Sequence, residues 1–256
     1  MGNPKYQWRV TKYNPALRDE NGYFTLKDEW ISASAIGETF NGVEFTLEEY
    51  LRVESAYIES VAKFLADSNL TFLRILKFSP GEITAEEKAS DLYERTFDSL
   101  SLSEDALVGL DEIKLICKMV LRNFIYCQFY FDNHFFVHFG WDYYMYIGSD
   151  HPSLTAIRFA EKNGLFVENF TSPYFIAPEN VVREIEWGKI NEETLEDSEA
   201  LPEIPLADYR TLFMLSASHP IIGSFPVTED HQSFFQPLLN HQMDFAKYTY
   251  QLFCSD

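Results

Sequence analysis

The sequence predicts an α+β fold in which an antiparallel, aromatic-rich sheet is packed by helices. Between residues 126 and 146, eleven of twenty-one side chains are Phe, Tyr or Trp, which favour a pleated surface. Turn signals at 132–133 and 140–141 divide this stretch into three strands that can pair as a meander. Apolar residues at helical spacing over 46–68 and 103–121 supply helices to cover that sheet.

Two-residue turns would fix the register of the meander, with strands at about 125–131, 134–139 and 142–147. One predicted face carries Ile125, Cys127, Phe129, Phe131, His134, Phe136, His138, Tyr143, Met145 and Ile147. The other carries Tyr126, Gln128, Tyr130, Phe135, Val137, Phe139, Asp142, Tyr144 and Tyr146. Both faces are too apolar for one of them to lie in water. An odd number of residues in either loop would exchange the faces of the strands beyond it.

Before the meander, strands are expected at 6–13, 23–32 and 70–78. The helix over 46–68 begins with a capping box in which Thr46 is followed three residues later by Glu49. A second capping pattern predicts an exposed acidic helix over 84–98, and the next helix, over 103–121, leads into the meander.

After the meander, a helix is expected from Pro152 or Ser153 to residue 162, followed by a strand over 165–170. Pro178 predicts a helix to residue 187, and the acidic, proline-containing stretch 191–205 predicts a surface loop or linker. Helices are expected over 206–217 and over 229–253, the latter interrupted near Pro237.

These elements suggest an N-terminal unit of residues 1–80 and a C-terminal unit of residues 81–256 that holds the meander and a helical tail. The two would be similar small α+β halves. A single domain is the alternative, because 256 residues can also bury one large core.

The charge narrows the classes of partner. Forty acidic side chains against twenty basic ones give a net charge of −20, which disfavours nucleic acid and anionic membrane surfaces as partners. A basic protein fits this charge, and an acidic surface that only confers solubility is the alternative. Without a signal-peptide core or a membrane-length apolar run, we expect a cytoplasmic protein. Its three cysteines, Cys117, Cys127 and Cys254, are expected to be reduced and mostly buried.

We find no strong catalytic motif, and we predict no catalytic residues, no cofactor and no metal. The best metal candidate combines His134, His138, Asp142 and the pair Asp150-His151. Two histidines four residues apart on one strand lie about 13 Å from each other, too far to share an ion. Polar side chains in an aromatic sheet are therefore the favoured interpretation.

The remaining candidates are contact residues for a partner. Tyrosines combine a large apolar ring with a polar tip, as at binding hot spots, and carboxylates steer a basic partner electrostatically. The predicted contact residues are Tyr126, Tyr130, Asp142, Tyr144, Tyr146, Glu192, Glu193, Glu196, Asp197 and Glu199. The alternative is that the tyrosines belong to the core.

Three stretches, WRVTKYNPALRDENGYFTLKDEW (8–30), FTLEEYLRVESAYI (45–58) and FFVHFGWDYYMYIG (135–148), resemble the cytoplasmic immunity proteins that bacteria encode beside secreted polymorphic toxins. The resemblance implies a non-enzymatic, tight-binding inhibitor of a cognate toxin, often a basic nuclease. Two alternatives are a small-molecule or metal-dependent enzyme with its site at the His/Tyr face of the sheet, and a structural adaptor subunit.

Overall fold

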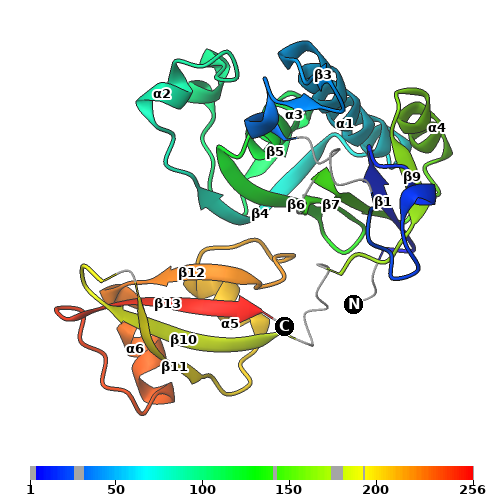
Figure 1. Ribbon diagram of the computed structural model, residues 1–256. Coiled ribbons are helices and arrows are strands. Elements are labelled where there is room, and N and C mark those ends of the chain that lie inside the picture. The colour runs from blue at the N-terminus through cyan, green and yellow to red at the C-terminus, as the bar shows by residue number, and fades with distance from the viewer. Residues whose placement is uncertain (1–3, 26–31, 141–142, 174–180, 193, 256) are drawn as a thin grey trace. The chain divides into compact units, whose positions relative to one another are not determined.

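The computed structural model describes residues 4–25, 32–140, 143–173, 181–192 and 194–255 (Figure 1). The chain forms two compact units, Met1–Ser172 and Pro173–Asp256. Each unit combines an antiparallel sheet with helices, so the predicted α+β class is confirmed.

A seven-stranded antiparallel sheet in the order β5-β4-β6-β7-β8-β1-β9 forms the centre of the N-terminal unit (Figure 1). Its strands, in chain order, are β1 (Tyr6–Thr11), β4 (Phe72–Pro80), β5 (Leu107–Gly109), β6 (Ile125–Phe131), β7 (Phe135–Phe139), β8 (Met145–Ser149) and β9 (Phe166–Asn169). A separate small hairpin consists of β2 (Thr39–Phe40) and β3 (Val43–Glu44). The aromatic meander is therefore three adjacent strands of this sheet, β6 to β8.

The helices of this unit are α1 (Leu47–Asp67), α2 (Ala85–Lys88), α3 (Leu110–Leu121) and α4 (Leu154–Lys162). Helix α1 begins where the sequence predicts, because the Thr46 hydroxyl accepts a hydrogen bond from the Glu49 backbone N–H. Helices α1 and α3 lie over one face of the sheet (Figure 1). Their apolar side chains join that face in a single core that includes Phe64 and Ile116. Apolar side chains from segments that are far apart in sequence thus form one hydrophobic core.

Two of the predicted helices are shorter than expected. The acidic helix over 84–98 is only α2, although its capping box forms with Thr84 and Glu87, and a 3-10 turn follows at Arg95–Ser99. The helix expected from residue 103 begins at Leu110, because the three residues before it form β5 and pair with β4. Pairing with a neighbouring strand overrides helix propensity at this end.

The predicted faces are correct for β6 and β8 but exchanged for β7. The row Phe129, Val137, Ile147 crosses the meander on the core face, and the row Gln128, His138, Tyr146 crosses it on the other. Phe131 pairs with Phe135, and Phe139 pairs with Met145, so both loops hold an odd number of residues. The first odd loop exchanges the faces of β7, and the second restores them for β8.

The C-terminal unit has a four-stranded antiparallel sheet in the order β11-β10-β13-β12 (Figure 1). Its strands are β10 (Val182–Lys189), β11 (Leu195–Ala200), β12 (Gly223–Val227) and β13 (Tyr248–Ser255). Its helices are α5 (Leu206–Leu212) and the single turn α6 (Gln232–Phe235), flanked by 3-10 turns. Helix α5 is the shortened form of the helix expected over 206–217.

Three predictions for this unit were wrong. The stretch expected as a helix over 178–187 is strand β10 from Val182 on, and residues 178–180 lie outside the described part of the chain. The expected loop at 191–205 contains β11, and the helix expected to reach residue 253 gives way to β13. In β13, buried Tyr250, Leu252 and Cys254 alternate with less buried neighbours, which is the period-two pattern of a strand.

We predicted a division of the chain between residues 80 and 81. Strand β4 ends at Pro80 and pairs with β6, so residues from both sides of that division belong to one sheet. The two compact units divide after Ser172 instead. Hydrogen bonding between strands that are distant in sequence unites the two predicted parts.

Candidate functional site

The acidic residues predicted to contact a partner gather at one edge of the C-terminal sheet. Strand β11 is an outer strand and carries Glu196, Asp197 and Glu199. Glu192 lies exposed in the turn that precedes it, and Glu193 lies outside the described residues. We call the group Glu192, Glu196, Asp197 and Glu199 the acidic edge.

The carboxylates of the acidic edge have different surroundings. Glu199 accepts hydrogen bonds from the backbone N–H groups of Asn240 (2.8 Å) and His241 (3.1 Å), which lower its pKa. Glu196 is exposed and faces the Lys189 ammonium at 3.4 Å. Asp197 is exposed and accepts from the Ser198 backbone N–H at 2.9 Å. Glu199 therefore anchors a loop of the unit itself, whereas Glu196 and Asp197 present charge to solvent.

The backbone of β11 also faces outward at alternate residues. The Leu201 N–H donates to the Arg183 carbonyl at 2.9 Å, and the register pairs Ile185 with Glu199. Because hydrogen-bonded and non-bonded pairs alternate in an antiparallel ladder, the N–H and C=O groups of Ser198 and Ala200 point to the open edge. The Asp197 carboxylate caps the first of these N–H groups.

The other outer strands of the two larger sheets are less able to add a strand. Strand β5 spans three residues and β9 four, and β12 contains Pro226, which has no N–H to donate. With six residues, β11 offers the longest outer strand of these sheets in the described structure.

The predicted tyrosine contacts do not form one exposed surface. Tyr130 and Tyr146 are buried; the Tyr130 hydroxyl donates to Asp105 at 2.6 Å, and the Tyr146 ring stacks on His138. Tyr144 is half-buried, while Tyr126 is 41% exposed. Asp142 lies outside the described residues. The tyrosines and the acidic edge also belong to different units of the chain.

His138 lies on the predicted His/Tyr face and is buried. Burial lowers its pKa to about 3, and its Nε2 lies 3.2 Å from the Ser172 hydroxyl. A serine beside a histidine suggests nucleophilic chemistry. A base with so low a pKa, however, removes a proton poorly at neutral pH, so this pair fits packing better than catalysis.

The low pKa of His138 has a consequence for stability. The folded protein disfavours the protonated ring, whereas the unfolded chain protonates it below about pH 6.5, so stability is lost as the pH falls from there toward about 3. From pH 7 to pH 5, protonation of this histidine in the unfolded chain lowers the free energy of unfolding by about 2 kcal/mol. Urea unfolding measures the free energy of unfolding at the two pH values. Its decrease from pH 7 to pH 5 should be smaller by this amount in His138→Gln than in the wild type. The exposed-site variant His151→Gln should keep the wild-type drop, and an equal drop in all three proteins would contradict the assignment.

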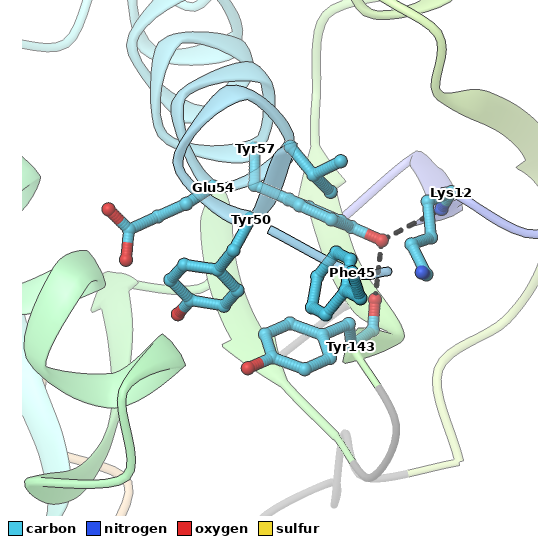
Figure 2. Close-up of a pocket in the computed structure, with 7 residues that line it drawn as sticks. Lys12, Phe45, Tyr50, Glu54, Tyr57 and Tyr143 are labelled. Carbon is cyan, nitrogen blue, oxygen red and sulfur yellow. Dashed lines mark hydrogen bonds between the residues drawn. The ribbon is translucent and has the colours of Figure 1, made fainter. Parts of the chain in front are cut away.

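A small pocket lies between α1, β1 and the loop before β8 (Figure 2). Its volume for water is about 10 Å³, roughly the space of one water molecule, whereas substrate pockets begin near 300 Å³. The lining residues are Lys12, Phe45, Tyr50, Val53, Glu54, Tyr57 and Tyr143. This pocket is a packing feature of the N-terminal unit and has no room for a substrate.

The tyrosine hydroxyls around this pocket are engaged in hydrogen bonds. Tyr57 accepts from the Lys12 N–H and donates to the Tyr143 carbonyl, both at 2.8 Å (Figure 2). Tyr143 and Tyr50 both donate to the Leu121 carbonyl, at 2.7 and 3.2 Å. Burial raises the pKa of all three phenols above the ordinary value for tyrosine. The sequence predicted only an apolar stripe on the helix over 46–68, and the hydrogen-bonding role of Tyr50 and Tyr57 on that helix was missed.

Of the candidate metal residues that the structure describes, His134 and Asp150 lie together, but His138 does not join them. His134 is exposed, and its Nδ1 lies 2.5 Å from the Asp150 carboxylate, while His138 is buried. Across the described residues, no group of three or more His, Cys, Asp or Glu side chains is placed to hold a metal ion. Cys117, Cys127 and Cys254 are free and buried, and burial raises the pKa of each thiol, that of Cys254 to about 12.

Comparison with known proteins bears on the C-terminal unit. Residues 182–253 match a family model described as "Domain of unknown function (DUF7683)". The matched segment runs from the first residue of β10 into β13, so it includes β10, β11, β12 and most of β13. No curated protein and no solved structure matches the chain. None of the described helices combines the length and the apolar character that a bilayer crossing requires.

Proposed function

We propose that this chain is a non-enzymatic binding protein for a positively charged protein, and that it acts as an immunity protein that neutralises a cognate toxin. The observation that carries the proposal is the acidic edge. It places exposed carboxylates along an outer strand on which the carbonyls of Ser198 and Ala200 and the N–H of Ala200 point to the open edge, while the Ser198 N–H is capped by Asp197. Such a strand can meet a partner through charge and through main-chain hydrogen bonds.

The distribution of charge supports a contact on the C-terminal unit. Residues 173–256 contain fourteen acidic side chains and four basic ones, so this third of the chain carries half of the net charge of −20. A field of this sign attracts a basic partner and speeds encounter, and the gain declines as salt screens the charges.

Inhibition by occlusion fits these features. A stoichiometric blocker needs no reaction chemistry of its own, because it only has to cover the toxin's active site. If the toxin is a nuclease, its active site binds phosphates, and carboxylates compete for the same basic side chains. A basic nuclease toxin is therefore the partner we propose.

The test is a binding measurement with the product of the neighbouring gene, at low and at physiological salt. We expect a 1:1 complex that weakens as salt is added. The double variant Glu196→Lys/Asp197→Lys should weaken it by roughly tenfold or more, because it reverses charge at the contact. Glu199 is left unchanged, since its carboxylate holds the loop at Asn240.

The matched control is Glu86→Lys/Asp91→Lys, which makes the same change in net charge at exposed positions of the N-terminal unit. This control should lose much less affinity than the β11 variant at equal salt. Equal losses of affinity in the two double variants would show that net charge alone determines binding, and β11 would then not be the contact. If the neighbouring gene product does not bind the wild-type protein, the immunity proposal fails.

A further inference from the structure

Two arginines share one carboxylate at the edge of the N-terminal sheet. Arg9 on β1 pairs across the ladder with Glu168 on β9, and Arg18 reaches the same carboxylate from the segment after β1. The rings of Tyr144 and Phe170 complete the group. We call these five residues the arginine cluster. It holds two positive charges and one negative charge in a chain whose net charge is −20.

The two guanidinium groups use different edges. Arg9 grips Glu168 with its Nε and an Nη atom, at 3.1 and 3.4 Å, which is the forked geometry that guanidinium offers to a carboxylate. Arg18 donates to both oxygens of Glu168 through Nη1 alone, at 2.8 Å. Its Nε and Nη2 are buried, and among the residues that the structure describes they have no hydrogen-bond partner. The edge of Arg18 that corresponds to the gripping edge of Arg9 is therefore unused.

An unused, buried guanidinium edge is costly. The Arg18 side chain is only 8% exposed, so water does not compensate its two unmatched donors. Glu168 cannot fill them, because both of its oxygens are already engaged by two arginines. The Tyr144 ring lies 5.3 Å from the Arg9 guanidinium and 5.8 Å from that of Arg18, which favours the positive charges but supplies no acceptor in the plane of the fork.

We propose that the Nε/Nη2 edge of Arg18 binds a small oxyanion, a carboxylate or phosphate group, as a second site unrelated to the acidic edge. Two oxygens of such a group match the two parallel N–H bonds of the fork. A carboxylate, with its single negative charge, would also bring the charge of the cluster to neutrality. Because Nε and Nη2 are themselves buried, the binding that we propose requires a neighbouring side chain to move, and Phe170, which is 36% exposed, and the Glu168 side chain, which is 25% exposed, lie next to solvent.

The experiment uses the full chain at fixed ionic strength, with sodium chloride replaced stepwise by sodium acetate or sodium phosphate. The readout is the Nε–H signal of each arginine in two-dimensional ¹H–¹⁵N spectra. We expect the Arg18 signal to shift saturably, while that of exposed Arg52, held by Glu49, stays in place. A shift with acetate alone assigns the site to carboxylates, one with phosphate alone to phosphates, and one with both to either.

Thermal unfolding in the same buffers supplies the matched comparison. A bound anion should raise the Tm of the wild-type protein. Arg18→Lys keeps the positive charge beside Glu168 but lacks the fork, so this rise should largely disappear in the variant. Arg52→Lys should retain the wild-type rise. General salt effects on stability act on all three proteins equally. An Arg18 signal that does not move, or an equal rise in Tm for Arg18→Lys and the wild type, overturns the proposal.

Discussion

Replacing Arg122 by methionine is expected to lower the free energy of unfolding of the N-terminal unit by roughly 3–5 kcal/mol. The Arg122 and Glu54 side chains are 2% and 4% exposed, and they meet through two hydrogen bonds of 2.7 and 2.6 Å. The substitution leaves the Glu54 carboxylate buried without its main counter-charge. That desolvation, rather than the lost attraction, makes the effect large.

The same arginine also joins segments that are distant in sequence. Its Nη1 donates to the Leu92 carbonyl at 2.5 Å and to Glu94 at 2.9 Å, and Glu94 in turn accepts from Lys118. Arg122 thus ties the end of α3 both to α1 and to the irregular segment that follows α2. Loss of the side chain should loosen all three at once.

Urea unfolding followed by circular dichroism measures the effect, with Arg52→Met as the control. Arg52 pairs with Glu49 on the exposed side of α1, so its loss should cost less than about 1 kcal/mol. The double variant Glu54→Met/Arg122→Met should regain most of the stability, because no unpaired charge remains buried. A double variant as unstable as Arg122→Met would show that packing, and not the buried charge, sets the cost.

The sequence predicted those parts of the fold that are encoded locally. The capping residue Thr46 marks the start of α1, and the dense aromatic stretch marks the meander. The exchanged faces of β7 arose from a detail that composition does not reveal. Asp132 adopts a left-handed backbone with φ of 46°, and the turn takes three residues rather than two.

The C-terminal unit was mispredicted for a different reason. Strands β10 and β13 pair over their whole lengths, although some sixty residues separate them in the chain. Each strand is only eight residues long, and over so short a stretch the helical and the strand-like periodicity are hard to tell apart from sequence. The pairing of these two strands, which are distant in sequence, decides between helix and strand. Local sequence patterns do not reveal that pairing.

The candidate sites divide along the same line. The acidic edge could be predicted because its carboxylates are neighbours in sequence, although the strand that presents them was expected to be a loop. The arginine cluster could not, because Arg9 and Arg18 lie 159 and 150 residues from Glu168. Partners at such separations become visible only when the sheet is assembled.

Replacing Tyr57 by alanine is expected to cost roughly 3–5 kcal/mol, the range for a large buried aromatic side chain. This residue is fully buried, and its ring lies 6.4 Å from those of Phe139 and Tyr143. Its hydroxyl bridges the Lys12 N–H and the Tyr143 carbonyl (Figure 2), so the side chain joins α1 to the end of β1 and to the loop before β8.

The variant Tyr57→Phe separates the two contributions, because it keeps the ring and removes only the bridge. It should cost roughly 1–3 kcal/mol, since a backbone donor and a backbone acceptor then lose their buried partner. Hydrogen exchange of the Lys12 amide should accelerate in the same variant, which ties the lost stability to that bond. Tyr23→Phe, at a residue that is 72% exposed, is the control. If Tyr57→Phe unfolds like this control, the ring alone stabilises the fold. If Tyr57→Phe instead loses a third or more of the free energy of unfolding that Tyr57→Ala loses, the hydroxyl also stabilises the loop that contains Tyr144, a member of the arginine cluster.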